Sequence, residues 1–105
     1  MIKSNIKQLH NLFHLNKKVI IVTGALGLLG QKHVEVIAQN GGIPIILDID
    51  ERKVRLAAKK IEQKYHVPAL GLKVDITDEK MIIESCNKII KQYRHIDGLV
   101  NNAAN

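Results

Sequence analysis

Three glycines spaced three residues apart follow a short β-branched run. The run covers residues 19–22, and Thr23 separates it from Gly24, Gly27 and Gly30. The first glycine of such a series lets the chain leave a strand in a tight turn, and the second lets the backbone approach a ligand without an intervening Cβ. The third lets the following helix pack closely on the strand. This spacing is typical of a turn that binds the pyrophosphate of a dinucleotide.

An acidic residue stands where such a site needs one. Asp48 follows the next apolar run, and an acid about 20 residues beyond the glycines is expected to accept hydrogen bonds from the adenosine ribose. Between them, the pattern predicts a helix that begins near Leu28 and Leu29, where free N–H groups and the helix dipole favour phosphate. Strand, glycine turn, helix and acid in this order are a stronger signal than the glycines alone.

Strand and helix patterns alternate along the chain, which predicts a parallel sheet built from βαβ units. The expected strands cover residues 18–23, 43–47, 70–74 and 98–101. The expected helices run over residues 28–40, from an N-cap at Asp50 to before Pro68, and onward from an N-cap at Thr77. Gly41 is expected to end the first helix in the left-handed conformation.

Right-handed crossovers then predict the topology. The third strand lies outermost beside the second, and the fourth pairs with the first, which gives the strand order 3-2-1-4 with helices on both faces. This is a Rossmann-type α/β fold, truncated after its fourth strand. Ligands bind such sheets at the carboxyl ends of the strands, where the winding direction reverses. The glycine turn and Asn101 are both expected at that point.

Composition limits the class of protein. The 105 residues are expected to form an N-terminal extension, residues 1–16, and a partial dinucleotide-binding domain, residues 17–105. Only 3% of the residues are aromatic, which argues against a stacking platform for single-stranded nucleic acid. No apolar run is long enough to span a bilayer, and the lone Cys86 fits a reducing compartment. A cytoplasmic protein without a membrane partner is therefore expected.

The formal net charge of +6 has a local origin. Many of the basic residues fall in the second predicted helix, beside an apolar stripe: Arg52, Lys53, Arg55, Lys59, Lys60 and Lys64. A solvated helix face accounts for them, and no nucleic-acid partner is expected, because no reader motif accompanies the charge. A nucleic-acid-associated module is the competing class, and strong, salt-sensitive binding would support it.

The first residues carry apolar side chains at helical spacing: Ile2, Ile6, Leu9 and Phe13. A short amphipathic helix that packs on the sheet edge or on a neighbouring subunit is expected. His10 and His14 have a spacing that could suit a metal, but without a third ligand no metal site is expected.

Two further motifs follow the glycine turn in order. Val74-Asp75-Ile76-Thr77 comes after the third predicted strand, and Asn101-Asn102-Ala103-Ala104 comes after the fourth. With these motifs the chain, from about Leu12 to its end, resembles the short-chain dehydrogenase/reductase superfamily. The resemblance implies an oxidoreductase with a nicotinamide cofactor and a small-molecule substrate.

The resemblance also assigns the cofactor-binding residues. It implies that the glycines hold the pyrophosphate, that Asp48 binds the ribose, and that Asp75 and the Ile76 backbone contact the adenine. The full set is Thr23, Gly24, Gly27, Leu28, Leu29, Gly30, Asp48, Asp75, Ile76, Asn101, Ala103 and Ala104. For Asp75, Asn101 and Asn102, a purely structural role is an open alternative.

Two details refine the assignment. The spacing G-x-x-G-x-x-G is that of the extended, sugar-nucleotide-modifying branch, whereas the fourth-strand motif is nearer the simple branch and has Ala104 in place of the usual glycine. This mixture is similar to members from surface-polysaccharide or flagellar-glycan pathways. NAD is expected over NADP, because Asp48 would repel a 2′-phosphate and apolar Leu26 and Ile49 replace the basic residues of NADP-preferring relatives. Arg52 is the nearby cation that could oppose this preference.

In this family the catalytic serine and the Tyr-x-x-x-Lys pair come after the fourth-strand motif, and the chain stops at Asn105. Tyr65 and Tyr93 lack a lysine four residues on, so no catalytic residue is assigned and no activity is expected from this chain alone. The leading hypothesis is the NAD-binding part of a homo-oligomeric oxidoreductase acting on an alcohol or carbonyl, including sugar-derived ones. The alternative is a non-catalytic nucleotide-binding remnant of a truncated gene; the later motifs disfavour a methyltransferase.

Overall fold

The computed structural model describes residues 14–103. Its strands are β1 (Val19–Thr23), β2 (Ile43–Asp48), β3 (Leu70–Lys73) and β4 (Gly98–Asn101), and its helices are α2 (Leu28–Gln39), α3 (Glu51–Tyr65) and α4 (Glu79–Tyr93). All the strands are parallel and their order is β3-β2-β1-β4. The predicted fold class and strand order are therefore confirmed. The predicted N-terminal helix, His10 and Ala104 lie outside the described residues, and the division into residues 1–16 and 17–105 stays a prediction.

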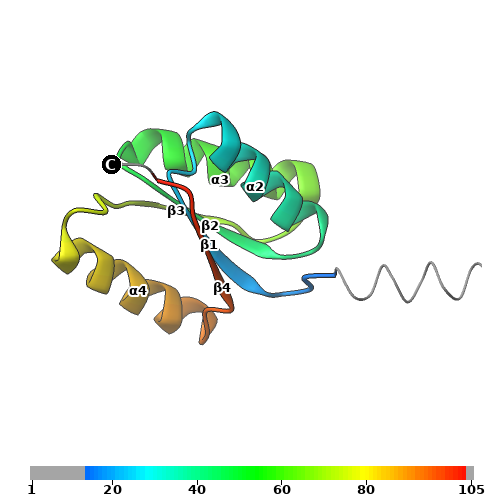
Figure 1. Ribbon diagram of the computed structural model, residues 1–105. Coiled ribbons are helices and arrows are strands. Elements are labelled where there is room, and N and C mark those ends of the chain that lie inside the picture. Colours follow the sequence, from blue (N-terminus) through cyan, green and yellow to red (C-terminus); the bar gives the residue numbers. More distant parts are fainter. Residues whose placement is uncertain (1–13, 104–105) are drawn as a thin grey trace, which may run out of the picture.

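The sheet is covered by helices on both faces (Figure 1): α2 and α3 pack on one face and α4 on the other. The sheet therefore separates two apolar clusters. Val22 and Ile46 pack with α2 and α3, whereas Ile21 and Ile45 pack with Ile89 of α4. Neighbouring residues of a strand point to opposite faces, so a strand buried on both sides is apolar throughout, as β1 and β2 are.

The helix ends follow local chemistry. Gly41 has φ +80° and its N–H donates to the Ala38 carbonyl, while Gly42 N–H donates to the Ile37 carbonyl, which together form a Schellman C-cap. Asp50 caps α3 by accepting a hydrogen bond from the Lys53 N–H, as the sequence predicts.

The predicted N-cap of α4 is wrong by one residue. Asp78, not Thr77, caps α4 and accepts a hydrogen bond from the Met81 N–H at 3.2 Å. The N–H and Oγ1 of Thr77 both donate to Asp75 Oδ1, at 2.9 and 2.7 Å. Thr77 is therefore held in a turn closed by the Asp75 side chain, and the chain becomes helical one residue later.

The strand register brings the chemistry-bearing residues to one edge of the sheet. Thr23 at the end of β1 lies opposite Leu47 of β2 and Asn101 of β4. The carboxyl ends of these three strands therefore meet where the chain reverses its winding direction, which is the expected ligand position. Within residues 14–103, no helix is long and apolar enough to cross a membrane.

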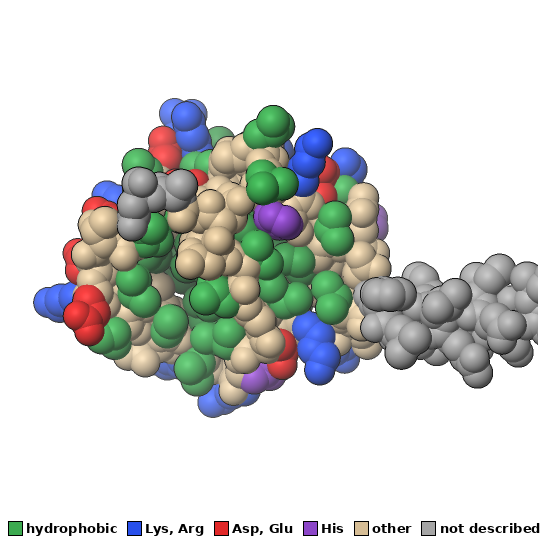
Figure 2. All heavy atoms as spheres, viewed as in Figure 1, with side chains coloured by type: hydrophobic (Ala, Val, Ile, Leu, Met, Phe, Trp, Pro, Cys, Tyr) green, Lys and Arg blue, Asp and Glu red, His purple; other side chains and the backbone are tan. Residues whose placement is uncertain are grey.

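Within residues 14–103, strand β4 forms an edge of the sheet and pairs with β1. Figure 2 shows hydrophobic side chains gathered in the middle of the face that includes β4 and α4. Leu99 of β4 is 61% exposed, and Ile83 and Ile90 of α4 are also exposed. This β4–α4 face is an apolar surface next to an edge strand with open backbone groups.

Candidate functional site

Two of the three glycines are required by close backbone contacts. Gly24 has φ +60°, and a Cβ there would lie 2.8 Å from the Cα of Ala103. A Cβ on Gly30 would lie 2.3 Å from the Gly24 carbonyl oxygen and 2.8 Å from the Cα of Ala25. These positions match the tight turn and the close helix–strand packing predicted for the first and third glycines.

Gly27 differs from both, because a Cβ there would meet only the Gly24 carbonyl oxygen, at an ordinary 3.4 Å. No steric contact within the described residues therefore requires glycine at this position. It leaves open space over the beginning of α2, where the prediction puts a pyrophosphate.

The N-terminus of α2 is open to an anion. Its N-cap is Gly27, no side chain caps it, and its first turn contains no acidic residue. The first two helical residues, Leu28 and Leu29, are 79% and 58% exposed. The N–H groups of a first helical turn have no partners within the helix, and the helix dipole makes this end positive. The geometry is that of a phosphate-binding helix terminus.

Asp48 lies beside this turn and has both carboxylate oxygens in hydrogen bonds. Oδ2 accepts from the Leu26 N–H at 2.9 Å, and Oδ1 accepts from the Ile49 N–H at 2.8 Å. The side chain therefore ties the glycine turn to the end of β2. Each carboxylate oxygen has a second lone pair, so the group can still accept from ligand hydroxyls.

Asp75 occupies the next position along the same edge, after β3. Its Oδ1 accepts both hydrogen bonds from Thr77, and these bonds, from the hydroxyl first and then the N–H, lower the pKa of the Asp75 carboxyl. The group is a carboxylate at neutral pH, with Oδ2 left to accept from a ligand.

A cleft of about 440 Å³ joins these features. Of the predicted site residues, it is lined by Gly24, Gly27, Asp48, Asp75, Ile76 and Ala103. The other lining residues are Leu47, Ile49, Val74, Thr77 and Asn102. The cleft thus combines apolar walls, two carboxylates and the open end of α2, a combination suited to an adenine ring, a ribose and a pyrophosphate.

Thr23 and Asn101, also among the predicted site residues, are in contact with each other at the edge of the cleft. Thr23 is 9% exposed; its Oγ1 accepts from the N–H groups of Asn102 and Ala103 at 3.0 and 3.1 Å and lies 3.1 Å from Asn101 Oδ1, to which it donates. The Asn102 side chain donates to the Gly24 carbonyl at 3.1 Å. These contacts connect the end of β4 to the glycine turn. Asn101 and Asn102 therefore have a structural role here, which was the alternative to ligand binding.

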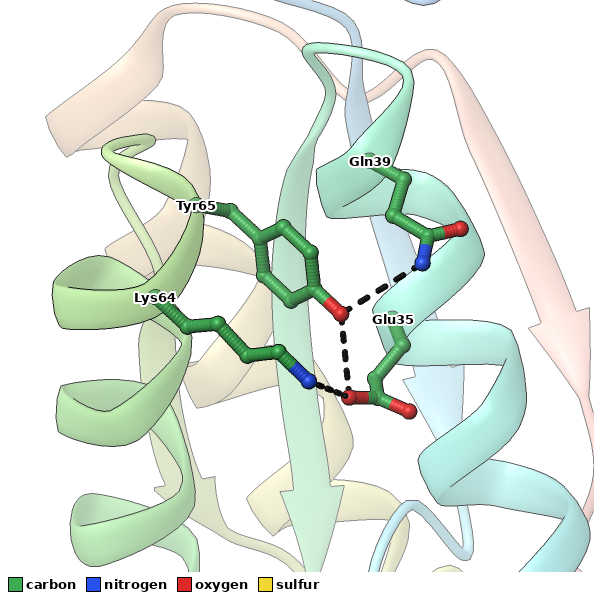
Figure 3. Close-up of polar contacts among 4 residues, drawn as sticks. All are labelled: Glu35, Gln39, Lys64 and Tyr65. Carbon is green, nitrogen blue, oxygen red and sulfur yellow. Dashed lines mark hydrogen bonds and ion pairs between the residues drawn. The ribbon is translucent and has the colours of Figure 1, made fainter.

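Neither tyrosine lies at the cleft. Tyr65 ends α3, at the opposite end of the sheet, where its hydroxyl donates to Glu35 Oε1 at 3.0 Å (Figure 3). Lys64 Nζ binds the same oxygen at 3.1 Å, and these bonds, that from Lys64 first, lower the pKa of Glu35. Tyr93 ends α4 and lines a hollow beside the first residues of β1 and β2. Both tyrosines are thus remote from the carboxyl ends of the strands.

A second, larger groove of about 670 Å³ lies between α2 and α3, and no predicted site residue lines it. It adjoins the site through Leu26, Ile49 and Asp50. Within residues 14–103, no three His, Cys, Asp or Glu side chains gather closely enough to hold a metal ion.

Sequence reasoning missed Gln31, whose side chain contacts the glycine turn, and the part that Thr77 plays in holding Asp75. A glutamine early in an amphipathic helix carries no pattern that could have singled it out. The Asp-x-Thr spacing is a known turn pattern and could have indicated the second contact.

Comparison with known proteins agrees with this geometry. The family model described as short chain dehydrogenase matches residues 18–105. Post-translational flagellin modification protein A of Campylobacter coli is 33% identical over 89 residues, which are 85% of this chain and 35% of that protein.

Two solved structures show the same fold. The L-sorbose reductase of Gluconobacter frateurii, in complex with NADPH and L-sorbose, superposes with a TM-score of 0.84 at 22% identity, over 89% of this chain and 35% of that one. An NAD⁺-bound xylitol dehydrogenase superposes with a TM-score of 0.78 at 28% identity, over 87% of this chain and 35% of that one. The chain spans about a third of the length of these relatives.

Proposed function

The chain belongs to the short-chain dehydrogenase family, and we propose that it forms the NAD-binding part of an oxidoreductase. The observation that carries the proposal is the uncapped N-terminus of α2, which opens beside a cleft lined by Asp48 and Asp75. A helix terminus attracts the pyrophosphate, and the two carboxylates accept hydrogen bonds from the ribose and the adenine amino group.

Each part of the cofactor has a proposed set of contacts. Gly27 and the N–H groups from Leu28 to Gly30 receive the pyrophosphate, because the cleft has no side chain in the way there. Asp48 receives the ribose hydroxyls. Asp75 and the Ile76 backbone receive the edge of the adenine, whose faces lie between the apolar walls of the cleft.

A preference for NAD over NADP forms part of the proposal. A 2′-phosphate at the ribose would meet the carboxylate of Asp48, and like charges at short range repel by a few kcal/mol at the dielectric of a partly buried site, roughly 4 kcal/mol at 4 Å. Asp50 adds a second carboxylate just beyond β2. Arg52 and Lys53 are the cations close in sequence, and they would moderate this repulsion.

The nicotinamide group of the cofactor would supply or accept a hydride. This chain's residues bind and orient the adenosine half of the cofactor. We propose that residues 1–105 alone transfer no hydride, because Tyr65 and Tyr93 lie at the other end of the sheet. An alcohol or carbonyl substrate, sugar-derived as in the flagellar-glycan type, is the proposed substrate class of the oxidoreductase.

Equilibrium titration of the chain with NAD, NADP, ADP and adenosine tests the proposal. We expect NAD to bind more tightly than NADP, and ADP to bind more tightly than adenosine because of its pyrophosphate. Equal, negligible binding of all four would overturn the assignment of the cleft. Measurable hydride transfer by the chain alone would contradict the proposed division of roles.

A further inference from the structure

One peptide of the glycine turn is held at both ends. The Leu26 carbonyl accepts a hydrogen bond from Gln31 Nε2 at 2.7 Å, and the Gly27 N–H donates to the Gly24 carbonyl at 3.2 Å. The C=O and N–H of one planar trans peptide point in opposite directions, so these two bonds together fix its orientation. The restraint matters here because glycine has no Cβ that would oppose rotation of this peptide.

The two sides of this peptide face different hollows. Gly27 lines the cleft, whereas Leu26 and Gln31 line the groove between α2 and α3. The bond from Gln31 therefore keeps the Leu26 carbonyl on the groove side. If the peptide turned over, a carbonyl oxygen with partial negative charge would face the region where the first N–H groups of α2 are free to bind an anion.

A second side chain completes the restraint on Leu26. Asp48 Oδ2 accepts from the Leu26 N–H at 2.9 Å, so both backbone groups of this residue are bound by side chains, one from β2 and one from α2. Gln31 is exposed and does not itself line the cleft; its side chain contacts Leu26, which lies outside the cleft lining. Its effect on a ligand would act through the turn.

We propose that Gln31 is a positioning residue for the diphosphate group of the ligand. It holds the Leu26–Gly27 peptide with the carbonyl away from the cleft, so that the end of α2 offers N–H groups alone. This proposal rests on the proposed function, since it concerns the same cleft. It is specific to the diphosphate and leaves the adenosine contacts, at Asp48 and Asp75, unchanged.

The test compares Gln31→Met with Gln39→Met in the 105-residue chain. Methionine has about the length and helix propensity of glutamine, but its side chain cannot donate a hydrogen bond. Gln39 lies at the far end of the same helix, so its variant controls for the loss of a helical glutamine. We expect Gln31→Met to weaken ADP binding about two- to twelvefold, the range for the net contribution of one hydrogen bond, and to leave adenosine affinity unchanged. The control should change neither.

A second readout needs no ligand. The exchange of the Gly27 amide hydrogen should be faster in Gln31→Met than in the wild type and in Gln39→Met, because the peptide is released. Unchanged ADP affinity, or an equal loss for ADP and adenosine, would overturn the proposal, as would unchanged Gly27 exchange. If the wild type binds no ADP, the proposed function fails, and the exchange measurement alone decides whether Gln31 restrains the turn.

Discussion

At the scale of single residues, the three glycines of the turn have unlike reasons for being glycine. At Gly24 and Gly30 the protein's own backbone leaves no room for a side chain, whereas Gly27 faces open space. A pattern of equal spacing therefore contains two structural positions and one that is free for a ligand. Substitutions at Gly27 and Gly30 should separate binding from folding.

We expect Gly27→Val to fold and to lose ADP binding by more than tenfold. The extended backbone of Gly27 accepts a β-branched residue, at a cost of about 1 kcal/mol for a poorer N-cap. Gly30→Ala should instead lose several kcal/mol of stability, because its Cβ overlaps backbone atoms that cannot move away. Thermal unfolding and ADP titration of both variants check this. Undiminished ADP binding by Gly27→Val would contradict the role of the turn.

Asp48 combines a structural role with its proposed ligand role. We expect Asp48→Ala to weaken NAD binding, because the ribose loses its acceptor. The preference for NAD over NADP should also fall, because the carboxylate that would repel a 2′-phosphate is gone. The variant should also lose about 1–3 kcal/mol of stability, since the Leu26 and Ile49 N–H groups lose their acceptor. Titration with both cofactors and denaturant unfolding measure the two effects. An unchanged preference would show that Asp48 is not the ribose acceptor.

At the scale of elements, the turn before α4 is where the sequence pattern and the structure differ. Thr77 and Asp78 are both good N-cap residues, and the sequence alone predicts the first. The Asp75 side chain decides between them by binding both donors of Thr77. A competition between two local hydrogen-bonding motifs thus determines where the helix begins.

Asp78→Ala should destabilise the protein by about 1 kcal/mol and make the Met81 amide exchange faster, because the helix loses its cap. Thr77→Val, which removes only the hydroxyl, should leave Met81 exchange unchanged. Hydrogen exchange of α4 resolves the two. Faster Met81 exchange in Thr77→Val but not in Asp78→Ala would show that Thr77, not Asp78, is the N-cap residue of α4.

At the scale of the whole molecule, a contact at the amino ends of the strands ties the first strand to the last. Asp97 Oδ2 accepts from the Val19 N–H at 2.8 Å and lies 2.7 Å from His95 Nδ1, while Asp97 N–H donates to the Val19 carbonyl. The hydrogen bond from Val19 lowers the pKa of Asp97 below its ordinary 3.8, and the His95 and Lys18 charges act in the same direction. Protonation of this carboxyl therefore opposes folding.

The sign of the pH dependence follows from this lowered pKa. The unfolded chain binds the proton more readily, so the stabilisation is complete above pH 3.8 and is lost as the pH falls through the pKa of the folded state. Asp97→Asn should reduce the loss of stability between about pH 5 and about pH 2, a range that brackets the ordinary pKa of an aspartate. Thermal unfolding across this range checks it. An identical pH profile in the variant would exclude Asp97 as a contributor.

The β4–α4 face bears on assembly. Leu99 is exposed on an edge strand, hydrophobic side chains gather on the face that includes β4 and α4 (Figure 2), and such surfaces favour association. We expect concentration-dependent self-association that Leu99→Lys reduces without unfolding the chain. Sedimentation velocity over a range of concentrations tests this. A wild type that stays monomeric throughout would contradict the expectation of a homo-oligomer.

The sequence by itself determined the elements, their order and the edge of the sheet at which the candidate site residues gather. Apolar runs on β1 and β2, the glycine spacing and the handedness of crossovers are local or general constraints, so they can be predicted without contacts. The tertiary structure decided what each polar group binds. Asp48 meets the Leu26 N–H, Thr23 meets the end of β4, and Gln31 turns the Leu26 carbonyl aside. These bonds depend on side-chain directions and on distances between separate elements, which the spacing of residues along one chain does not contain.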